Sequence, residues 1–367
     1  MATSSQTASA IARIGALRAQ MKVLKLDAYV VSHVPSLRYL FGFSGSTAMA
    51  VITSRKAYFL TNDLYQEQVK KELIKIDGLE IIINRDPWGA VTSKGLSKTW
   101  KYVGFDPTKH SISNYKTMKK AVSPAKLIET ASIIESITRV KSTSEIKNIA
   151  EAARIASIAY EKMLGILKPG MTEQQVSTFL ASTTRELGSE KDAFDIIVVA
   201  GIRSAMPHGR ASSAVIKKGD VVTVDFGCCI NGLYSDMTRT ICMDTPSKKI
   251  VDVFAVLYDA HMTAIDSVVS GVRASKLDKA ARSVIERAGY GEYFRHSLGH
   301  GLGYEVHELP RVSSVNKTET IPAGCVITIE PGIYLPGKFG MRIEDDVLVT
   351  DKGAQILTTA PLELVIV

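Results

Sequence analysis

The sequence predicts a mixed α/β protein that is divided into two domains. The chain has 367 residues, enough for two domains of ordinary size, and an apolar share of 46%, which suits globular cores. Over roughly the first 130 residues, short β-branched segments alternate with amphipathic ones, as in a sheet covered by helices. The rest of the chain instead repeats a unit of two helices and a hairpin. We therefore expect an α/β domain over residues 1–135 and an α+β domain over residues 136–367.

The first domain shows a regular succession of helix and strand patterns. Its first helix is predicted by apolar residues at steps of three and four, from Ile11 and Ile14 to Leu17 and Met21. Two alternating segments on either side of Ser54-Arg55 predict a hairpin. The predicted helices are residues 10–26, 64–73 and 113–121, and the predicted strands are residues 28–32, 48–53, 57–61, 79–83, 101–105 and 126–129. Residues 35–46 are predicted to form a short helix or turn that leads into a glycine-containing loop.

The second domain begins with two predicted helices and then repeats the arrangement. Ser142 and Glu145 form a capping-box pattern, and Thr172 starts a second helix in the same manner. The pattern then recurs 101 positions later, where Ile149, Gly170 and Gly188 match Ile250, Gly271 and Gly289. An offset of 105 superposes VVTVD on VITIE. We expect a pseudo-twofold domain in which two sheets meet face to face and the helices lie outside.

The first hairpin of this domain carries two aspartates where strands rarely have them. Residues 221–242 read VVTVDFGCCINGLYSDMTRTIC. A turn centred on Ile230-Asn231 places Asp225 and Asp236 directly opposite, whereas one centred on Asn231-Gly232 makes them diagonal neighbours on one face. In either register the two are about 5 to 8 Å apart, so a cation lies between them or one stays protonated. The alternative is two solvated aspartates on an exposed sheet face.

A second hairpin, residues 327–349, carries a second carboxylate pair. A turn centred on Gly337 places Glu330 directly opposite Glu344. Between the hairpins, His300 is bracketed by glycines, which allow the backbone to bring an imidazole close to a metal. Four carboxylates balance the charge of two divalent cations, so these five residues predict a dinuclear metal site.

In these motifs the sequence resembles the M24 "pita-bread" metallopeptidases, which include methionine aminopeptidase, prolidase and aminopeptidase P. The ligand order of that family is Asp, Asp, His, Glu, Glu, and it corresponds to Asp225 in VDFG, Asp236 in SDMTRT, His300 in GHGLG, Glu330 in TIEPG and Glu344 in RIEDD. The segment RYLFGFSGS resembles the N-terminal domain of the proline-specific branch, bacterial type. The resemblance implies a creatinase/prolidase-like domain over residues 1–135, a pita-bread catalytic domain over residues 136–367, and a homodimer in which each N-terminal domain covers the partner's active site.

The same resemblance implies roles for residues around the metals. His208 in MPHG and His307 in VHELPR correspond to histidines that bind substrate and stabilise the tetrahedral intermediate. Arg342 corresponds to an arginine beside the ligands, where it acts in catalysis or holds a carboxylate. Arg311 corresponds to an arginine suited to the free carboxylate of a dipeptide. Glu330 is expected to pass a proton to the leaving nitrogen.

The resemblance implies a dinuclear hydrolase that removes the first residue from Xaa-Pro peptides. An Xaa-Pro dipeptidase is the near alternative. A non-catalytic pita-bread peptide-binding module is a more distant one, because such modules have lost metal ligands. Oxygen-rich ligation favours Mn²⁺, with Co²⁺ and Zn²⁺ as alternatives.

The composition argues against nucleic-acid and membrane partners. The net charge of +8 is spread along the chain without a dense basic run. No apolar run approaches the roughly 18 to 20 residues that span a bilayer. The first residues lack a signal-peptide pattern, and the four cysteines show neither zinc-ligand nor redox spacing. We therefore expect a cytoplasmic protein.

Overall fold

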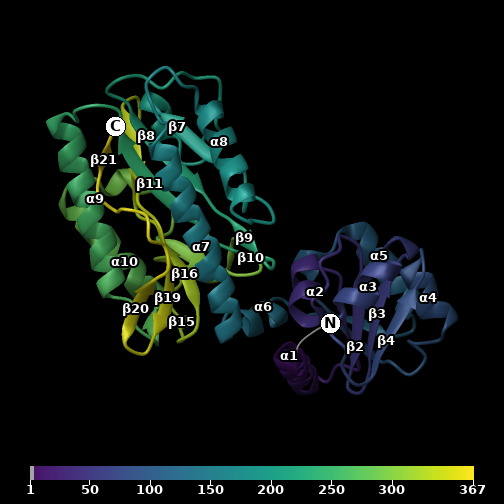
Figure 1. The fold of residues 1–367 in the computed structure, drawn as a ribbon. Helices are drawn as coiled ribbons and strands as arrows, with labels where there is room; N and C mark the ends of the chain where they lie inside the picture. Colours follow the sequence, from purple (N-terminus) through teal and green to yellow (C-terminus); the bar gives the residue numbers. More distant parts are fainter. Residues whose placement is uncertain (1–3) are drawn as a thin grey trace. The chain divides into compact units, whose positions relative to one another are not determined.

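The computed structural model describes residues 4–367, which form two compact units divided between Thr138 and Arg139 (Figure 1). Each unit contains its own sheets and helices, so the predicted two-domain mixed α/β class is confirmed. In the part of the chain that is described, no helix is both long enough and apolar enough to cross a bilayer.

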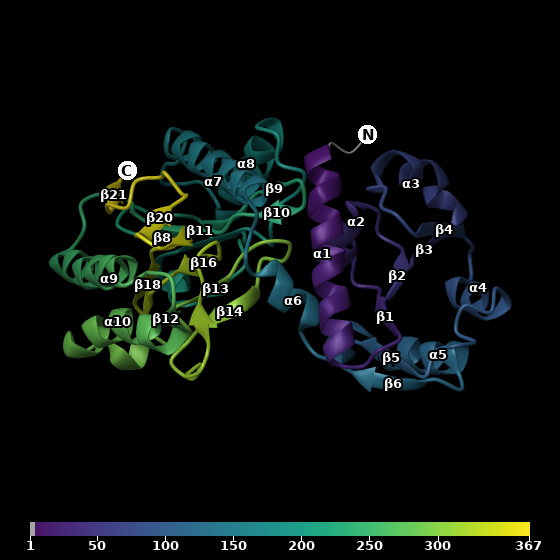
Figure 2. The ribbon, with the colours of Figure 1, turned by 90° about the horizontal axis from the view of Figure 1, so that it is seen from below.

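The N-terminal unit is built on one six-stranded sheet with helices on both faces (Figure 2). The strand order is β4-β3-β2-β1-β5-β6, and only β2 runs antiparallel to its neighbours. The strands are β1 (Ala28–Val31), β2 (Met49–Thr53), β3 (Ala57–Thr61), β4 (Leu79–Ile83), β5 (Tyr102–Phe105) and β6 (Lys126–Glu129). The α-helices are α1 (Ser4–Val23), α2 (Val34–Phe41), α3 (Gln66–Glu72), α4 (Pro87–Ser93), α5 (Ile112–Val122) and α6 (Ile133–Thr138).

The strand predictions for this unit hold, and two helices were missed. The predicted hairpin is present, with Ile52 paired to Ala57 across the turn at Ser54-Arg55. The missed helices α4 and α6 have seven and six residues, too few to show a periodic apolar stripe in the sequence. The buried face of the first helix also differs slightly from the predicted one, because Ile11 is exposed whereas Ala10 is buried.

The C-terminal unit consists of two similar halves. In the first half α7 (Thr143–Leu164) and α8 (Glu173–Glu186) pack against a four-stranded sheet of order β21-β11-β8-β7. In the second half α9 (Lys248–Asp266) and α10 (Ala274–Arg287) pack against a five-stranded sheet of order β14-β13-β16-β19-β20. The strands of the first half are β7 (Ile197–Ala200), β8 (Val221–Phe226), β9 (Cys229–Ile230), β10 (Leu233–Tyr234) and β11 (Met237–Cys242). Those that follow are β12 (Val272–Arg273), β13 (Gly299–Gly301), β14 (Glu308–Val312), β15 (Thr320–Ile321), β16 (Val326–Ile329), β17 (Gly332–Leu335), β18 (Phe339–Arg342), β19 (Asp345–Thr350), β20 (Gly353–Ile356) and β21 (Val365–Ile366).

The internal repeat predicted from the sequence is visible in matching backbone contacts. Gly170 and Gly271 both have positive φ, at 95° and 83°. Gly170 donates its N–H to Ile216 O at 2.9 Å, and Gly271 donates to Ile321 O at 2.8 Å. Both capping boxes predicted at Ser142 and Thr172 are also formed, with reciprocal hydrogen bonds to Glu145 and Gln175.

Both hairpins have registers that the sequence allowed. In the first, Asp225 pairs with Thr238, and Asn231 and Gly232 occupy the turn with positive φ, so the register centred on Asn231-Gly232 is the one formed. In the second, Gly332 pairs with Arg342 and Ile329 pairs with Asp345. Glu330 and Glu344 therefore lie opposite each other, as predicted, at the break between these two stretches of the ladder.

Candidate active site

One cavity in the C-terminal unit brings eight of the nine predicted site residues together. Its volume is about 510 Å³, within the range of small-ligand sites. The predicted residues that line it are His208, Asp225, Asp236, His300, His307, Glu330, Arg342 and Glu344, and the others are Phe194, Asp195, Ile197, Arg210, His296 and Ser297.

Thr238 joins the two hairpins beneath the cavity. It pairs with Asp225 in the ladder of β8 and β11, and it forms an isolated bridge with Glu344 from the second half. Its hydroxyl donates to Glu344 Oε2 at 2.6 Å. Asp236, two residues before Thr238, donates its backbone N–H to both carboxylate oxygens of Asp346. The carboxylates of the two halves are thus held together by the strand backbones that carry them.

His300 presents one ring nitrogen to this carboxylate group. Its Nδ1 lies 3.1 Å from Gly301 O, which can only accept, so Nδ1 carries the hydrogen and Nε2 keeps a free lone pair. Nε2 lies 3.4 Å from Glu330 Oε1 and 3.7 Å from Asp236 Oδ2. Burial, together with nearby His307, lowers the pKa of His300 to about 3, so the imidazole is neutral.

The carboxylates around His300 are too close together to remain charged without a cation. Burial, together with Asp225, raises the pKa of Glu344 to about 8. Burial and neighbouring carboxylates likewise raise the pKa values of Asp236 and Glu330 well above their usual range. Asp225 Oδ1 is buried and has no hydrogen-bond partner among the described residues.

This donor set fits divalent metal. Ligand atoms of Asp236, His300 and Glu344 all lie within 4.8 Å of one another. Neutral imidazole and carboxylate oxygens are ordinary ligands of divalent first-row cations, and a cation would remove the repulsion that raises these pKa values. The orphaned oxygen of Asp225 and the free Nε2 of His300 would also gain a partner.

Metal binding is expected to release protons and to strengthen as pH rises. Because burial and Asp225 raise the pKa of Glu344 from its ordinary value of 4.5 to about 8, Glu344 binds a proton at neutral pH that a cation must displace. Apparent affinity should therefore increase from about pH 5 and level off above about pH 8. Calorimetric titration of Mn²⁺ in two buffers of different ionisation heat measures the protons released, and Glu344→Gln should release fewer. Heats that are identical in the two buffers would contradict this account.

Arg342, on β18, is buried and contacts the carboxylates of Asp225 and Glu344. Its Nη2 lies 2.5 Å from Asp225 Oδ2, its Nε donates to the Thr238 hydroxyl at 2.9 Å, and its Nη1 donates to the Tyr334 hydroxyl at 2.6 Å. Its Nε also lies 3.9 Å from Glu344 Oε2. This arginine therefore fixes the orientation of Asp225 from the side of the second half.

Glu173 stabilises the loop that carries His208 through several hydrogen bonds. Its carboxylate is fully buried and accepts from Arg203 Nε at 3.0 Å and from both the N–H and the hydroxyl of Ser212, at 3.0 and 2.7 Å. Arg203 also donates to Arg210 O at 2.8 Å. Both ends of the loop are thereby tied to the start of α8, while His208 itself is exposed in the cavity.

His307 approaches His300 from the loop before β14. The two ring centroids are 4.2 Å apart, and the His307 side chain is exposed. The next residue, Glu308, forms a buried ion pair with Lys141, with Nζ 2.5 Å from Oε1. This ion pair fixes the start of β14 and so holds His307 beside His300.

Several functional neighbours of the site were not found from the sequence. His296, for which the sequence predicted no role, lines the cavity and lies 3.1 Å from the Tyr334 hydroxyl. Asp345 lies behind Glu344, where it binds Arg239 Nη2 at 2.7 Å and His261 Nε2 at 2.9 Å. Only the spacing of His296, four residues before His300, could have indicated its place.

Arg311 is the one predicted site residue that does not line this cavity. It lies on β14 with its side chain exposed, and it forms no ion pair among residues 4–367. The structure therefore leaves its guanidinium accessible but shows no contact with the carboxylate group.

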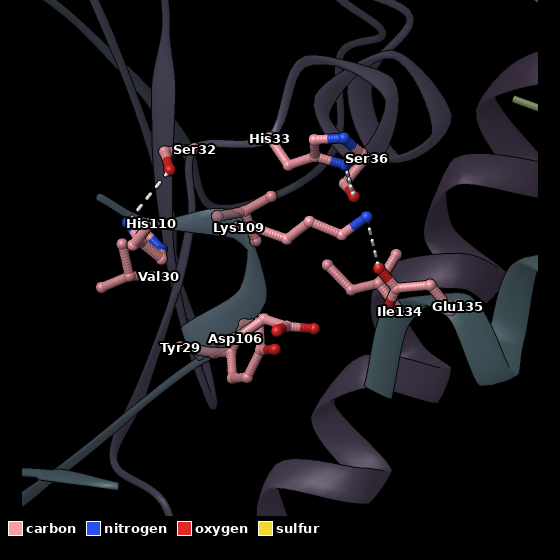
Figure 3. A pocket seen from close by; sticks show the side chains of 11 residues that line it. Tyr29, Val30, Ser32, His33, Ser36, Asp106, Lys109, His110, Ile134 and Glu135 are labelled. Carbon is pink, nitrogen blue, oxygen red and sulfur yellow. Dashed lines mark hydrogen bonds and ion pairs between the residues drawn. The ribbon is translucent and has the colours of Figure 1, made fainter. Parts of the chain in front are cut away.

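A second, smaller cavity lies in the N-terminal unit at the carboxyl ends of β1 and β5 (Figure 3). His110 lies 3.3 Å from the Ser32 hydroxyl, His33 lies 3.0 Å from the Ser36 hydroxyl, and Lys109 lies 3.4 Å from Glu135. With room for about 10 Å³, it holds at most one water molecule. We therefore assign the candidate active site to the larger cavity.

Two family models match this chain, and known proteins resemble it over almost its whole length. The family model described as metallopeptidase family M24 matches residues 147–351, and the creatinase/prolidase N-terminal domain model matches residues 13–140. An uncharacterized peptidase of Bacillus subtilis is 37% identical over 94% of this chain and 96% of its own length. An Xaa-Pro dipeptidase from Bacillus anthracis superposes with a TM-score of 0.93 at 36% identity, covering 98% of this chain and 100% of that one. An X-Pro aminopeptidase from Thermotoga maritima superposes with a TM-score of 0.89 at 33% identity, covering 96% of this chain and 99% of that one.

Proposed function

The chain belongs to metallopeptidase family M24, and from this premise we propose that it hydrolyses Xaa-Pro bonds with two divalent metal ions. The observation that carries the proposal is the buried group of four carboxylates and one neutral imidazole in a substrate-sized cavity. Solved structures similar over almost the whole chain are an Xaa-Pro dipeptidase and an X-Pro aminopeptidase, which supports the bond type.

We assign the metal ligands to Asp225, Asp236, His300, Glu330 and Glu344, and prefer Mn²⁺ because oxygen donors dominate. When bound, such ions supply a Lewis acid for the scissile carbonyl and lower the pKa of water.

The remaining roles belong to side chains that reach the cavity. Glu330, 3.4 Å from His300, can take a proton and return it to the leaving nitrogen. His208 and His307 are exposed in the cavity, where they can bind the peptide and stabilise developing charge on oxygen. Arg342 holds Asp225 in its orientation.

For substrate length, we propose removal of the first residue from Xaa-Pro-Yaa peptides, with Xaa-Pro dipeptides as further substrates. Among the described residues, the two arginines that line the cavity are already paired, Arg342 with Asp225 and Arg210 with Asp195, so neither is free for a substrate carboxylate. The free carboxylate of a substrate would therefore bind at the solvent side of the cavity. A longer peptide would extend out of the site in the same direction. A dipeptidase remains the second candidate because the similar Bacillus anthracis structure carries that name.

Arg311→Ala is expected to separate these two functions. The exposed, unpaired guanidinium of Arg311 is proposed to bind the free carboxylate of a dipeptide, so its loss should slow Xaa-Pro hydrolysis by about tenfold or more. Hydrolysis of Xaa-Pro-Yaa should change much less. The control is Arg154→Ala, which removes a surface arginine paired with Glu151 on α7.

The result would be read from kcat/KM on matched dipeptides and tripeptides. Equal losses on both substrates would give Arg311 a structural role. If the unaltered protein hydrolyses only dipeptides, the aminopeptidase assignment is wrong and the protein is an Xaa-Pro dipeptidase.

A further inference from the structure

The outer surface of the second half carries a basic groove between α9 and α10, which lie side by side (Figures 1 and 2). Its volume is about 760 Å³, the size of a small-molecule site. Four cations line it, namely Arg273, Lys276, Lys279 and Arg287, and no acidic side chain of the described part of the chain does. Among the described residues none of these four cations forms an ion pair, and all four are exposed.

The cations follow one face of α10. Positions 276, 279, 283 and 287 recur at steps of three and four, so Lys276 and Arg287 stand about 16 Å apart along one stripe. Ser283 completes the stripe, and Thr263 faces it from α9. Like charges at this spacing destabilise a helix slightly, so the stripe has no evident benefit for folding.

The other half of the repeat shows that the fold does not require this charge. At an offset of 101, α10 corresponds to α8 residue for residue. The counterparts of Arg273, Lys276, Lys279 and Arg287 are Thr172, Gln175, Thr178 and Glu186. The same position in the same architecture is therefore neutral or acidic in the first half.

The start of α10 also differs from its counterpart in a way that favours anions. Thr172 caps α8 through its side chain, whereas Arg273 gives α10 no side-chain cap, and the first turn of α10 has no acidic residue. The N–H groups of Ala274 and Ser275 at this helix start already donate to Glu319 O and Asn316 O, at 3.1 and 3.2 Å. The helix therefore contributes only the positive end of its dipole, which no acidic side chain of the first turn offsets.

From these observations we propose that the groove binds a small, multiply charged phosphate anion. Four exposed cations with the hydroxyl groups of Ser283 and Thr263 beside them suit phosphate oxygens. Within residues 4–367 no aromatic side chain lines the groove, so it offers neither a stacking surface for nucleobases nor the anchors typical of a protein partner. This site is separate from the catalytic cavity and does not depend on the proposed peptidase function.

The test is calorimetric titration of inorganic tripolyphosphate into the full chain at low salt. We expect saturable binding of one tripolyphosphate per chain. Lys276→Gln/Lys279→Gln should weaken it by about tenfold or more, because two charge-assisted contacts are lost. The control Lys162→Gln/Lys168→Gln removes the same net charge from exposed lysines of the first half. Because tripolyphosphate also binds divalent metal, the variants are compared at equal metal content.

Each outcome decides the proposal. An unchanged thermal unfolding transition in both double variants shows that they are folded, and selective weakening in Lys276→Gln/Lys279→Gln supports the groove. If both double variants weaken tripolyphosphate binding equally, the effect comes from net charge alone and the proposal is wrong. Absence of saturable binding overturns it, as does tighter binding of duplex DNA or anionic phospholipid vesicles than of tripolyphosphate at equal phosphate concentration.

Discussion

Asp236→Asn is expected to leave the protein folded but unable to hold its full metal complement, with kcat/KM lowered at least about a thousandfold. The loss follows because an anionic ligand becomes neutral, and metal supplies several kcal/mol of stabilisation to the transition state. Asp236 is buried, and its carboxylate lies within 4.8 Å of ligand atoms of His300 and Glu344. Asparagine keeps the side-chain shape, so packing is preserved. Elemental analysis and hydrolysis of an Xaa-Pro-Yaa peptide measure the two effects.

Thermal unfolding distinguishes a ligand role from a structural one. Burial and neighbouring carboxylates raise the pKa of Asp236 in the folded, metal-free protein. Once the pH exceeds the ordinary pKa of an aspartate, this carboxyl group therefore lowers the free energy of unfolding. Metal-free Asp236→Asn should therefore unfold at the same temperature as the metal-free parent, or higher, at and above neutral pH. The control Asp195→Asn, a largely exposed residue of the same cavity, should keep both metal and activity. Two ions per chain in Asp236→Asn would contradict the ligand assignment.

His208→Ala and His307→Ala are expected to keep bound metal and to lose about 10²- to 10³-fold in kcat. Both side chains are exposed in the cavity, outside the group of buried ligands. Glu173 and the Lys141–Glu308 pair hold the two loops, so truncating the histidines should leave the loop backbones in place. Metal content and kcat are measured on the same preparations, with His110→Ala in the N-terminal unit as the control. Loss of metal in either variant would make that histidine a ligand.

Local patterns predicted the carboxylate hairpins because their registers depend on nearby residues. Asn231-Gly232 fixes one turn, and Gly337 centres the other, so the positions of Asp236 and Glu344 relative to their partners follow from counting along the chain. The repeat was predictable for a similar reason, since Gly170 and Gly271 mark equivalent turns.

The missed features depend on contacts between segments far apart in the sequence. Glu173 was recognised only as part of a helix start, yet its carboxylate binds Ser212, thirty-nine positions later. Asp345 forms hydrogen bonds with Arg239 and His261, which are both more than eighty positions away in the sequence. No local spacing predicts such a network. His296 shows the same limit, because its place in the cavity depends on Tyr334, thirty-eight positions away.

The most direct test of the central claim is to titrate Mn²⁺ into chelator-treated protein while following hydrolysis of an Xaa-Pro-Yaa peptide. The buried carboxylates and His300 predict no turnover without metal and a rise to full activity that ends at two ions per chain. Undiminished hydrolysis by protein shown by elemental analysis to be metal-free would contradict the dinuclear account.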